Sequence, residues 1–221
     1  MTETSHHRAT ILASIRLSLG TPQTADQIAA EYATIKRTYR RYGTMNHDEL
    51  VDFFEDRLRE YDAGVYRAEL NAIASTISAI LTKRGKHGLV MPSGIPKSWL
   101  PQAFDFEQID DEDAYRIDRS EGVMTGCTVA IAETGSIVLQ NAPGQGPRIL
   151  SLVPDYHLCV VRAGQIVSQV PEAFDRLAGS SSLPTTFVSG PSATADIEMT
   201  RIKGVHGPRF LDVLIVNDAT A

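Results

Sequence analysis

The run His157-Leu-Cys-Val-Val161 decides the fold class of this chain. It is almost continuously apolar, which is typical of an interior strand of a parallel sheet that is buried on both faces. A last strand is expected at Phe210–Val216. The other expected strands are residues 65–68, 88–91, 136–139 and 185–189. Helical segments separate most of these strands, and the alternation predicts a three-layer α/β domain with a mostly parallel sheet.

Three helices are expected before the first strand, at residues 9–19, 24–42 and 48–61. We therefore expect an N-terminal helical extension at residues 1–62 and an α/β domain at residues 63–221. The third helix, at residues 48–61, is interpreted as a cap packed on the domain, with a lid or a partner-docking arm as the alternative.

Composition narrows the function classes. The chain has 221 residues and a formal net charge of −6, which does not favour binding to nucleic acid or to an anionic membrane surface. The two cysteines, Cys127 and Cys159, are expected to be free thiols and are too few for an iron–sulfur cluster. The N-terminus lacks the apolar core of a signal peptide, and no apolar run is long enough for a membrane span. We expect a cytoplasmic protein without a cofactor of its own, while homo-oligomerisation stays open.

Ser189–Glu198 is a turn-rich stretch with small residues and two carboxylates. Gly190 follows an expected strand directly, and ligands in open α/β sheets bind beyond the carboxyl ends of strands. Ser192 or Thr194 is expected to cap a following helix, whose free N–H groups would bind an anion. Asp196 would then lie in the first helical turn, where its charge suits the helix dipole but repels a phosphate. Either it points away from the ligand, or the ligand is not a simple phosphate.

Gly204-Val-His-Gly-Pro208 is a second tight turn. His206, next to Gly207, is a candidate acid, base or hydrogen-bond donor near neutral pH. A turn histidine that bonds neighbouring backbone is the alternative. Candidate metal ligands do not follow a known zinc or calcium spacing, so no metal site is expected.

Glu133 lies in the small and apolar stretch Ala130–Leu139. Burial there would raise its pKa and make it a candidate base or nucleophile. A glutamate that ties two loops together is the alternative. Thr134 and Ser136 add hydroxyl groups, Gly135 leaves room for a ligand, and the glycine-rich loop at residues 141–147 is expected to cover the same cleft.

Four motifs together resemble the LUD-domain proteins, and within them the lactate utilisation protein C (LutC/YkgG) subgroup. They are Ala130–Leu139, Ser151-Leu-Val-Pro-Asp-Tyr-His157, Ser189–Glu198 and Gly204–Pro208. The resemblance covers roughly residues 64–216. It implies a fold similar to the NagB/RpiA/CoA-transferase group, and a role with iron–sulfur partner proteins in oxidising L-lactate to pyruvate.

Three functions follow as hypotheses, and the third of them is a pure scaffold in which the motifs serve packing. The first is a non-redox component of a lactate-utilisation system that binds a small anionic ligand, with Glu133 and His206 as catalytic candidates. Its candidate ligand-binding residues are Thr134, Gly135, Ser136, Gly190, Ser192, Thr194, Asp196 and Gly207. The alternative is an acyl-CoA transferase or a sugar-phosphate isomerase-like enzyme that uses Glu133, because Glu133-Thr-Gly135 resembles the Glu-x-Gly of CoA transferases.

Overall fold

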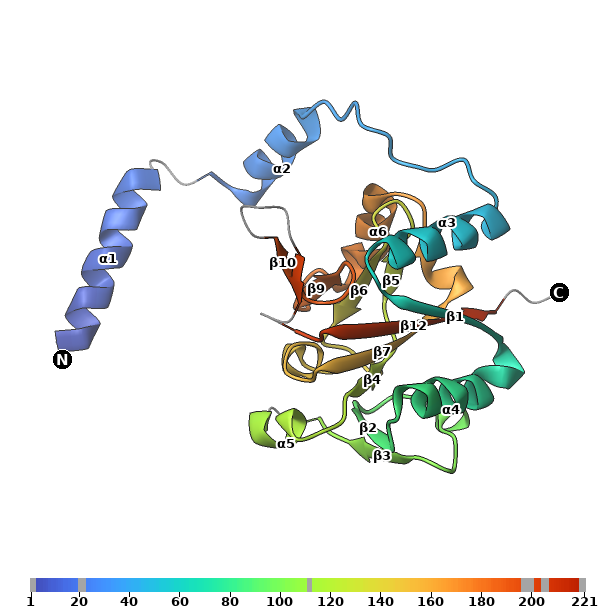
Figure 1. Cartoon of the computed structure of the whole chain (residues 1–221). Coiled ribbons are helices and arrows are strands. Elements are labelled where there is room, and N and C mark those ends of the chain that lie inside the picture. The colour runs from blue at the N-terminus through green and yellow to red at the C-terminus, as the bar shows by residue number, and fades with distance from the viewer. Residues whose placement is uncertain (1–2, 20–22, 111–112, 196–200, 204–206, 219–221) are drawn as a thin grey trace. The chain divides into compact units, whose positions relative to one another are not determined.

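A computed structural model of the chain describes residues 3–19, 23–110, 113–195, 201–203 and 207–218 (Figure 1). The chain divides into two compact units, residues 1–39 and residues 40–221. Among the described helices, none is long and apolar enough to cross a membrane.

The first unit contains the helices α1 (Glu3–Leu19) and α2 (Ala25–Thr34). Thr24 begins α2 with a capping box, in which its hydroxyl accepts from the Gln27 N–H and the Gln27 side chain accepts from the Thr24 N–H. The helix ends at Thr34, well before the expected residue 42. Arg37 contributes to this end, because its guanidinium donates to two carbonyl oxygens around the last turn.

A six-stranded sheet forms the centre of the second unit. Every neighbouring pair in it is parallel, so the expected mostly parallel sheet is confirmed. In spatial order the strands are β1 (Gly64–Glu69), β12 (Phe210–Asn217), β7 (Tyr156–Arg162), β4 (Val123–Thr125), β2 (Gly88–Met91) and β3 (Asp105–Gln108).

A second sheet accounts for two of the expected strands, which therefore do not belong to the parallel sheet. Its order is β8 (Ile166–Val167), β5 (Val129–Ile131), β6 (Ser136–Gln140) and β9 (Thr185–Val188). β6 is antiparallel to both β5 and β9. The turn at residues 132–135 explains this, because so short a connection joins antiparallel neighbours. A separate antiparallel pair consists of β10 (Ala193–Ala195) and β11 (Arg201–Lys203).

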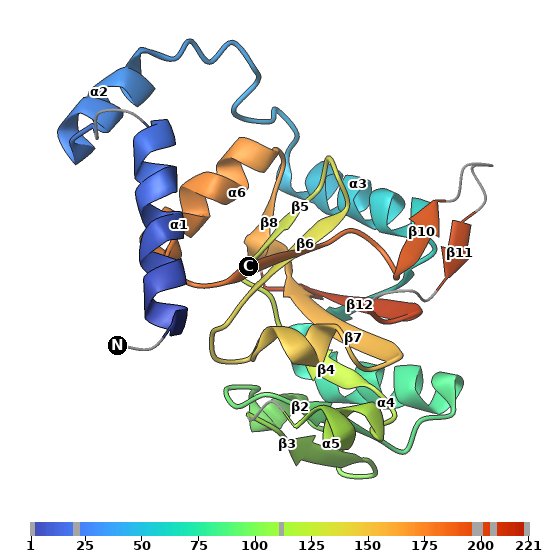
Figure 2. The same cartoon turned by 90° about the vertical axis from the view of Figure 1, so that its left-hand side faces the viewer.

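Helices and the second sheet cover the parallel sheet in layers (Figures 1 and 2). α4 (Ile73–Arg84) packs on one face, while α3 (His47–Glu60) and the second sheet pack on the other. α6 (Val170–Leu177) packs on the outer face of the second sheet, and α5 (Ala114–Asp118) packs near β2 and β4. Short 3-10 segments occupy Leu70–Ala72, Lys97–Trp99, Arg148–Ser151, Ala163–Gln165 and Ala178–Ser180. The expected three-layer α/β architecture is confirmed.

Strand β7 separates two apolar cores. Tyr156, Leu158 and Val160 pack toward α4, whereas Cys159 and Val161 pack toward α3 and the second sheet. Successive side chains of a strand point to opposite faces, so a continuously apolar strand supplies both cores.

Helix α3 lies in the second unit, although the sequence placed it within an extension at residues 1–62. Its buried residues Val51, Phe54 and Leu58 belong to the core that also contains β1 and β12. Asn46 and Glu49 form the capping box that begins the helix.

Asp212 is a fully buried carboxylate in the centre of the sheet. Arg84 of α4 donates two hydrogen bonds to it, at 2.6 and 2.8 Å, and the Tyr156 hydroxyl donates a third at 2.9 Å. Burial and the neighbouring Asp212 raise the pKa of Tyr156, so this hydroxyl stays a donor. A Cβ atom at Gly64 would lie 2.1 Å from Asp212 Oδ1, so only glycine leaves room for the carboxylate there.

Gly64→Ala is therefore expected to lower the free energy of unfolding by about 1–3 kcal/mol, as overpacking of a well-filled core does. The carboxylate cannot move aside without weakening its three hydrogen bonds. The measurement is urea unfolding of the second unit within the full chain. Gly179→Ala is the matched control, because an added Cβ meets nothing within 4 Å there. Equal losses of unfolding free energy in the two variants would contradict the inference that Gly64 leaves necessary space for the Asp212 carboxylate.

Candidate functional site

A cavity of about 280 Å³ lies where β9 runs into β10, beside the first residues of β7 and β12. We call it the Arg148 pocket. It lies at the amino ends of two central parallel strands and beyond the carboxyl end of β9, the strand after which the sequence analysis expected the ligand, although β9 belongs to the second sheet. Its main polar lining residues, with two glycines, are Arg148, Ser151, His157, Ser189, Gly190, Ser192 and Gly207.

Two of the turn motifs meet at this pocket, as the sequence analysis expected. The Ser192 N–H donates to the Pro208 carbonyl at 2.7 Å and holds the two loops together. Gly190 has φ 82°, and a Cβ there would lie 2.5 Å from the Cβ of Tyr61 at the end of α3. Glycine is therefore required at 190 both by the backbone conformation and by the approach of α3.

Arg148 brings a positive charge to the pocket. Its Nη1 donates to the Ser151 hydroxyl at 3.0 Å, and the guanidinium has no carboxylate partner among the described residues. The described lining contains serine hydroxyls and no aspartate or glutamate. A cation with hydroxyl donors and no competing anion suits a small carboxylate or phosphate.

His157 forms a buried wall of the pocket, and the sequence analysis did not select it as a site residue. Its Nε2 lies 2.7 Å from the Thr125 hydroxyl. Burial lowers its pKa to about 4, so the imidazole is neutral at physiological pH. A single histidine at the start of an otherwise apolar strand was the signal that could have identified it.

Glu133 does not have the environment expected from its apolar neighbours in sequence. Its side chain is exposed, because the turn between β5 and β6 carries it outward. It is not among the described lining residues of the Arg148 pocket. The expectation of a buried carboxylate is therefore wrong, and any role of Glu133 stays a proposal.

The residues after Glu133 support the pocket from behind. The Thr134 hydroxyl donates to Ser136 Oγ at 2.8 Å, and Ser136 Oγ lies 2.6 Å from Oγ of the lining residue Ser189. Gly135 has φ 57° and packs against Arg57 of α3, where a Cβ would lie 3.0 Å from the Arg57 Cβ. These three residues lie behind the lining rather than in it.

Among the described residues, no α-helix begins in the lining of the pocket. Thr194 lies in strand β10, which pairs with β11, so the expected helix does not begin at Ser192 or Thr194. Asp196, Glu198 and His206 lie outside the described residues.

The loop at residues 141–147 lies elsewhere. The Gly144 N–H donates to the Ser93 carbonyl at 2.6 Å, and the Gly144 carbonyl accepts from the Gly126 N–H at 2.7 Å. The loop therefore closes over the carboxyl ends of β2 and β4 and does not line the Arg148 pocket.

Cys127 and Cys159 are both buried and free. A hydrogen bond with the Cys159 thiol and burial raise the pKa of Cys127, which keeps it protonated and unreactive. Among the described residues, no group of three or more histidine, cysteine, aspartate or glutamate side chains is arranged to hold a metal ion.

Comparisons with known proteins agree on one family. The model of the LUD domain matches residues 44–216. A lactate utilization protein C from Deinococcus radiodurans is 40% identical over 175 residues, which cover 78% of this chain and 82% of the relative. A protein of the same name from Halalkalibacterium halodurans is 24% identical over 233 residues, with 96% and 98% covered. The crystal structure of a DUF162 family protein from Deinococcus radiodurans matches with a TM-score of 0.68 at 36% identity, over 79% of this chain and 100% of that chain.

His157 makes the stability of the protein pH-dependent. Its pKa falls from 6.5 in the unfolded chain to about 4 in the folded one, so the unfolded state binds more protons between these values. The free energy of unfolding that depends on the neutral His157 side chain is fully present above pH 6.5. It is lost as the pH falls toward 4. We expect His157 to remove about 2 kcal/mol of stability between pH 7 and pH 5.

Urea unfolding of wild type and His157→Gln at both pH values measures this loss. Glutamine keeps a partner for the Thr125 hydroxyl but does not titrate, so the variant should lose about 2 kcal/mol less than wild type over that range. The same pH dependence in both proteins would show that His157 is not buried as a neutral group.

Proposed function

Because the chain belongs to the LUD domain family, and within it to the lactate utilisation protein C subgroup, we propose that it is a component of an L-lactate utilisation system. It acts with partner proteins that carry iron–sulfur clusters, while this chain carries none. Its own two cysteines are buried and cannot supply the four ligands that a cluster normally takes. It works in the cytoplasm.

We place its ligand site in the Arg148 pocket, and the ligand is a small anion of the size of lactate or pyruvate. The observation that carries this proposal is the guanidinium of Arg148, which has no carboxylate partner among the described residues and lies beside serine hydroxyls in a cavity of about 280 Å³. Such a cavity holds a three-carbon acid with room for bridging water. Neutral His157 adds an imidazole to the wall without adding a second charge.

Binding and chemistry are separate questions in this pocket. Arg148 binds the carboxylate, and Ser189 and Ser192 orient its oxygen atoms. His206 and Asp196 remain candidate ligand contacts from the sequence. Nothing in this set of roles transfers electrons, so oxidation of lactate takes place on the partner proteins.

The alternative is an acyl-CoA transferase or a sugar-phosphate isomerase-like enzyme that uses Glu133. It predicts turnover by the pure protein and loss of that turnover in Glu133→Gln. Glu133 is exposed and not among the described lining of the pocket, so a lactate-system role predicts that Glu133→Gln retains function.

Growth of a deletion strain on L-lactate as sole carbon source tests the proposal, in a strain without another lactate dehydrogenase and with pyruvate as the control substrate. Plasmids carry wild type, Arg148→Gln, Glu133→Gln or the exposed Arg119→Gln, with protein levels matched. Wild type, Glu133→Gln and Arg119→Gln should restore growth, and Arg148→Gln should not. Calorimetric titration with L-lactate and pyruvate should show at least about tenfold weaker binding by Arg148→Gln, the loss of one charge-assisted contact.

Normal growth of the deletion strain on L-lactate would overturn the pathway assignment. Rescue by Arg148→Gln as good as by Arg119→Gln would leave the pathway intact and remove the Arg148 pocket from it. Failure of Glu133→Gln with rescue by Arg148→Gln would favour the enzyme alternative.

A further inference from the structure

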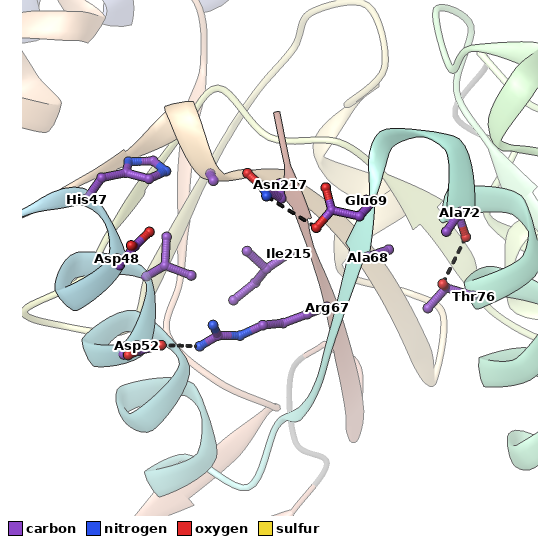
Figure 3. Close-up of a pocket in the computed structure, with 12 residues that line it drawn as sticks. His47, Asp48, Asp52, Arg67, Ala68, Glu69, Ala72, Thr76, Ile215 and Asn217 are labelled. Carbon is purple, nitrogen blue, oxygen red and sulfur yellow. Dashed lines mark hydrogen bonds and ion pairs between the residues drawn. The ribbon is translucent and has the colours of Figure 1, made fainter. Parts of the chain in front are cut away.

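A second and larger cavity, of about 580 Å³, lies between α3 and the parallel sheet (Figure 3). We call it the α3 cavity. α3, β1 and the end of β12 supply most of its lining, and the residues that start α4 and follow β7 complete it. Its size is in the range of cavities that hold small organic molecules.

The α3 cavity lies at the carboxyl ends of two parallel strands, where open α/β folds bind ligands. Glu69 and Asn217 are the last residues of the neighbouring parallel strands β1 and β12, and they pair in register. Asn217 Nδ2 donates to Glu69 Oε1 at 3.2 Å, so the two strand ends form one polar edge of the cavity. Ligands bind at the carboxyl ends of parallel strands because the loops and helices that follow leave a crevice there.

The floor of the α3 cavity is apolar. Ile215 comes from β12, Ala163 follows β7 and Val51 comes from α3, and all three belong to the apolar core on the α3 side of the sheet, whereas the side chain of Ala68 packs toward α4. Three of them are buried, so the floor belongs to the core itself. An apolar body of a ligand that covers this floor removes apolar surface from water, which is favourable.

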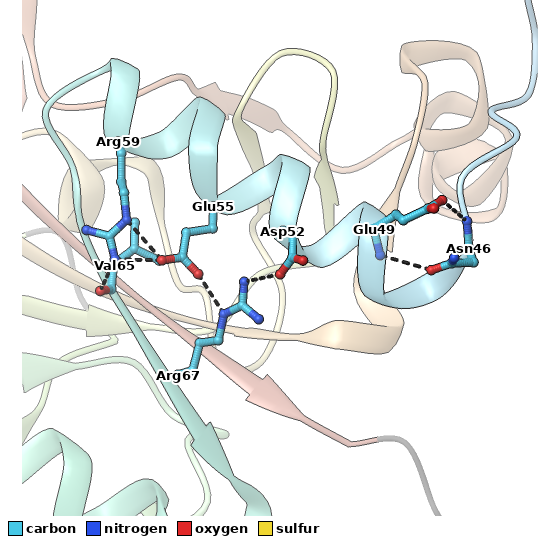
Figure 4. Close-up of polar contacts among 7 residues, drawn as sticks. All are labelled: Asn46, Glu49, Asp52, Glu55, Arg59, Val65 and Arg67. Atoms are coloured by element: carbon cyan, nitrogen blue, oxygen red, sulfur yellow. Dashed lines mark hydrogen bonds and ion pairs between the residues drawn. The ribbon is translucent and has the colours of Figure 1, made fainter.

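The one arginine in the described lining is already neutralised. Arg67 lies across the cavity and pairs with Asp52 and Glu55 of α3, each at 2.6 Å (Figure 4). Glu55 also accepts from Arg59 at 2.6 Å, which completes a network along the helix (Figure 4). His47 also lines the cavity, beside Asp48, and no arginine or lysine of the described lining is left without a carboxylate partner.

Two carboxylates remain at the rim. Asp48 and Glu69 face the cavity from opposite walls, and neither has a cationic partner among the described residues (Figure 3). The rim is therefore negative over an apolar floor, the reverse of the Arg148 pocket.

The N-terminus of α3 does not cancel the negative charge of the cavity rim. A helix N-terminus carries a partial charge of roughly +0.5. Here Asp48 and Glu49 lie in the first turn, and the Asn46 side chain accepts from the Glu49 N–H. The negative charge of the two carboxylates therefore exceeds the partial positive charge at this end of the helix.

We propose that the α3 cavity binds a small organic cation, an amine on an apolar body, with the carboxylates of Asp48 and Glu69 attracting the ammonium group and Ala163 and Ile215 contacting the body. This site is independent of the proposed lactate role, because its ligand has the opposite charge and its residues lie at the other end of β12. The site gives the protein a second ligand class.

Titration of the full chain with hexylamine tests the proposal, followed by amide NMR shifts at Ala68, Ala163 and Ile215. 1-Hexanol and hexanoate carry the same apolar body with no charge or a negative charge. Hexylamine should bind at least about tenfold more tightly than either, and its affinity should fall between about 50 mM and about 500 mM salt. Asp48→Asn and Glu69→Gln should each weaken hexylamine binding about three- to fivefold, as expected for one charge at a few ångströms in water.

Asp56→Asn is the matched control, because Asp56 is an exposed carboxylate of the same helix that does not line the cavity. It should leave the affinity unchanged. Hexanol binding as tight as hexylamine binding would overturn the cation assignment. Shifts outside the cavity, no shifts, or an effect of Asp56→Asn equal to that of Asp48→Asn would overturn the site. None of these outcomes depends on growth on lactate, so each proposal stands or fails by itself.

Discussion

The fold of the second unit depends on one buried charge, the carboxylate of Asp212. It lies in a central strand where an unpaired charge would be very costly, and three donors from α4 and β7 compensate it. Gly64 on the neighbouring strand leaves the space that the carboxylate occupies. One side chain therefore fixes the relative positions of β1, β12, β7 and α4. Because Arg84 reaches the carboxylate from the end of α4, this contact also fixes the register of that helix on the sheet.

The same strands place the two cavities. β12 begins beside the Arg148 pocket and ends at the α3 cavity, so its eight residues connect the site proposed for an anion with the site proposed for a cation. α3 approaches both regions, since Tyr61 near its end packs against Gly190 while Asp48 at its start lines the larger cavity. The helix is thus a structural part of the α/β unit.

Sequence patterns predicted the elements whose packing is decided by their own residues. The apolar run at residues 157–161 predicted a central strand, and the capped amphipathic helix at 48–61 matches α3. The second sheet was missed because strands buried on both faces give no alternation that separates parallel from antiparallel pairing. The apolar neighbours of Glu133 in the sequence predicted a buried side chain, although a tight turn directs that side chain outward. Thr194 has the composition of a helix cap, but pairing with β11 holds it in a strand.

The pairing of β1 with β12 has a consequence for biosynthesis. Glu69 and Asn217 are 148 residues apart in the chain, yet they are hydrogen-bonded neighbours. Synthesis proceeds from the N-terminus, so β1 and α3 leave the ribosome long before their partner strand exists. Closing a loop of that length costs about 4 kcal/mol of entropy before any packing compensates it. Until Phe210–Asn217 is made, the apolar face of α3 has no sheet edge to complete its core. A nascent chain at this stage is a natural client for chaperones that shield apolar helices.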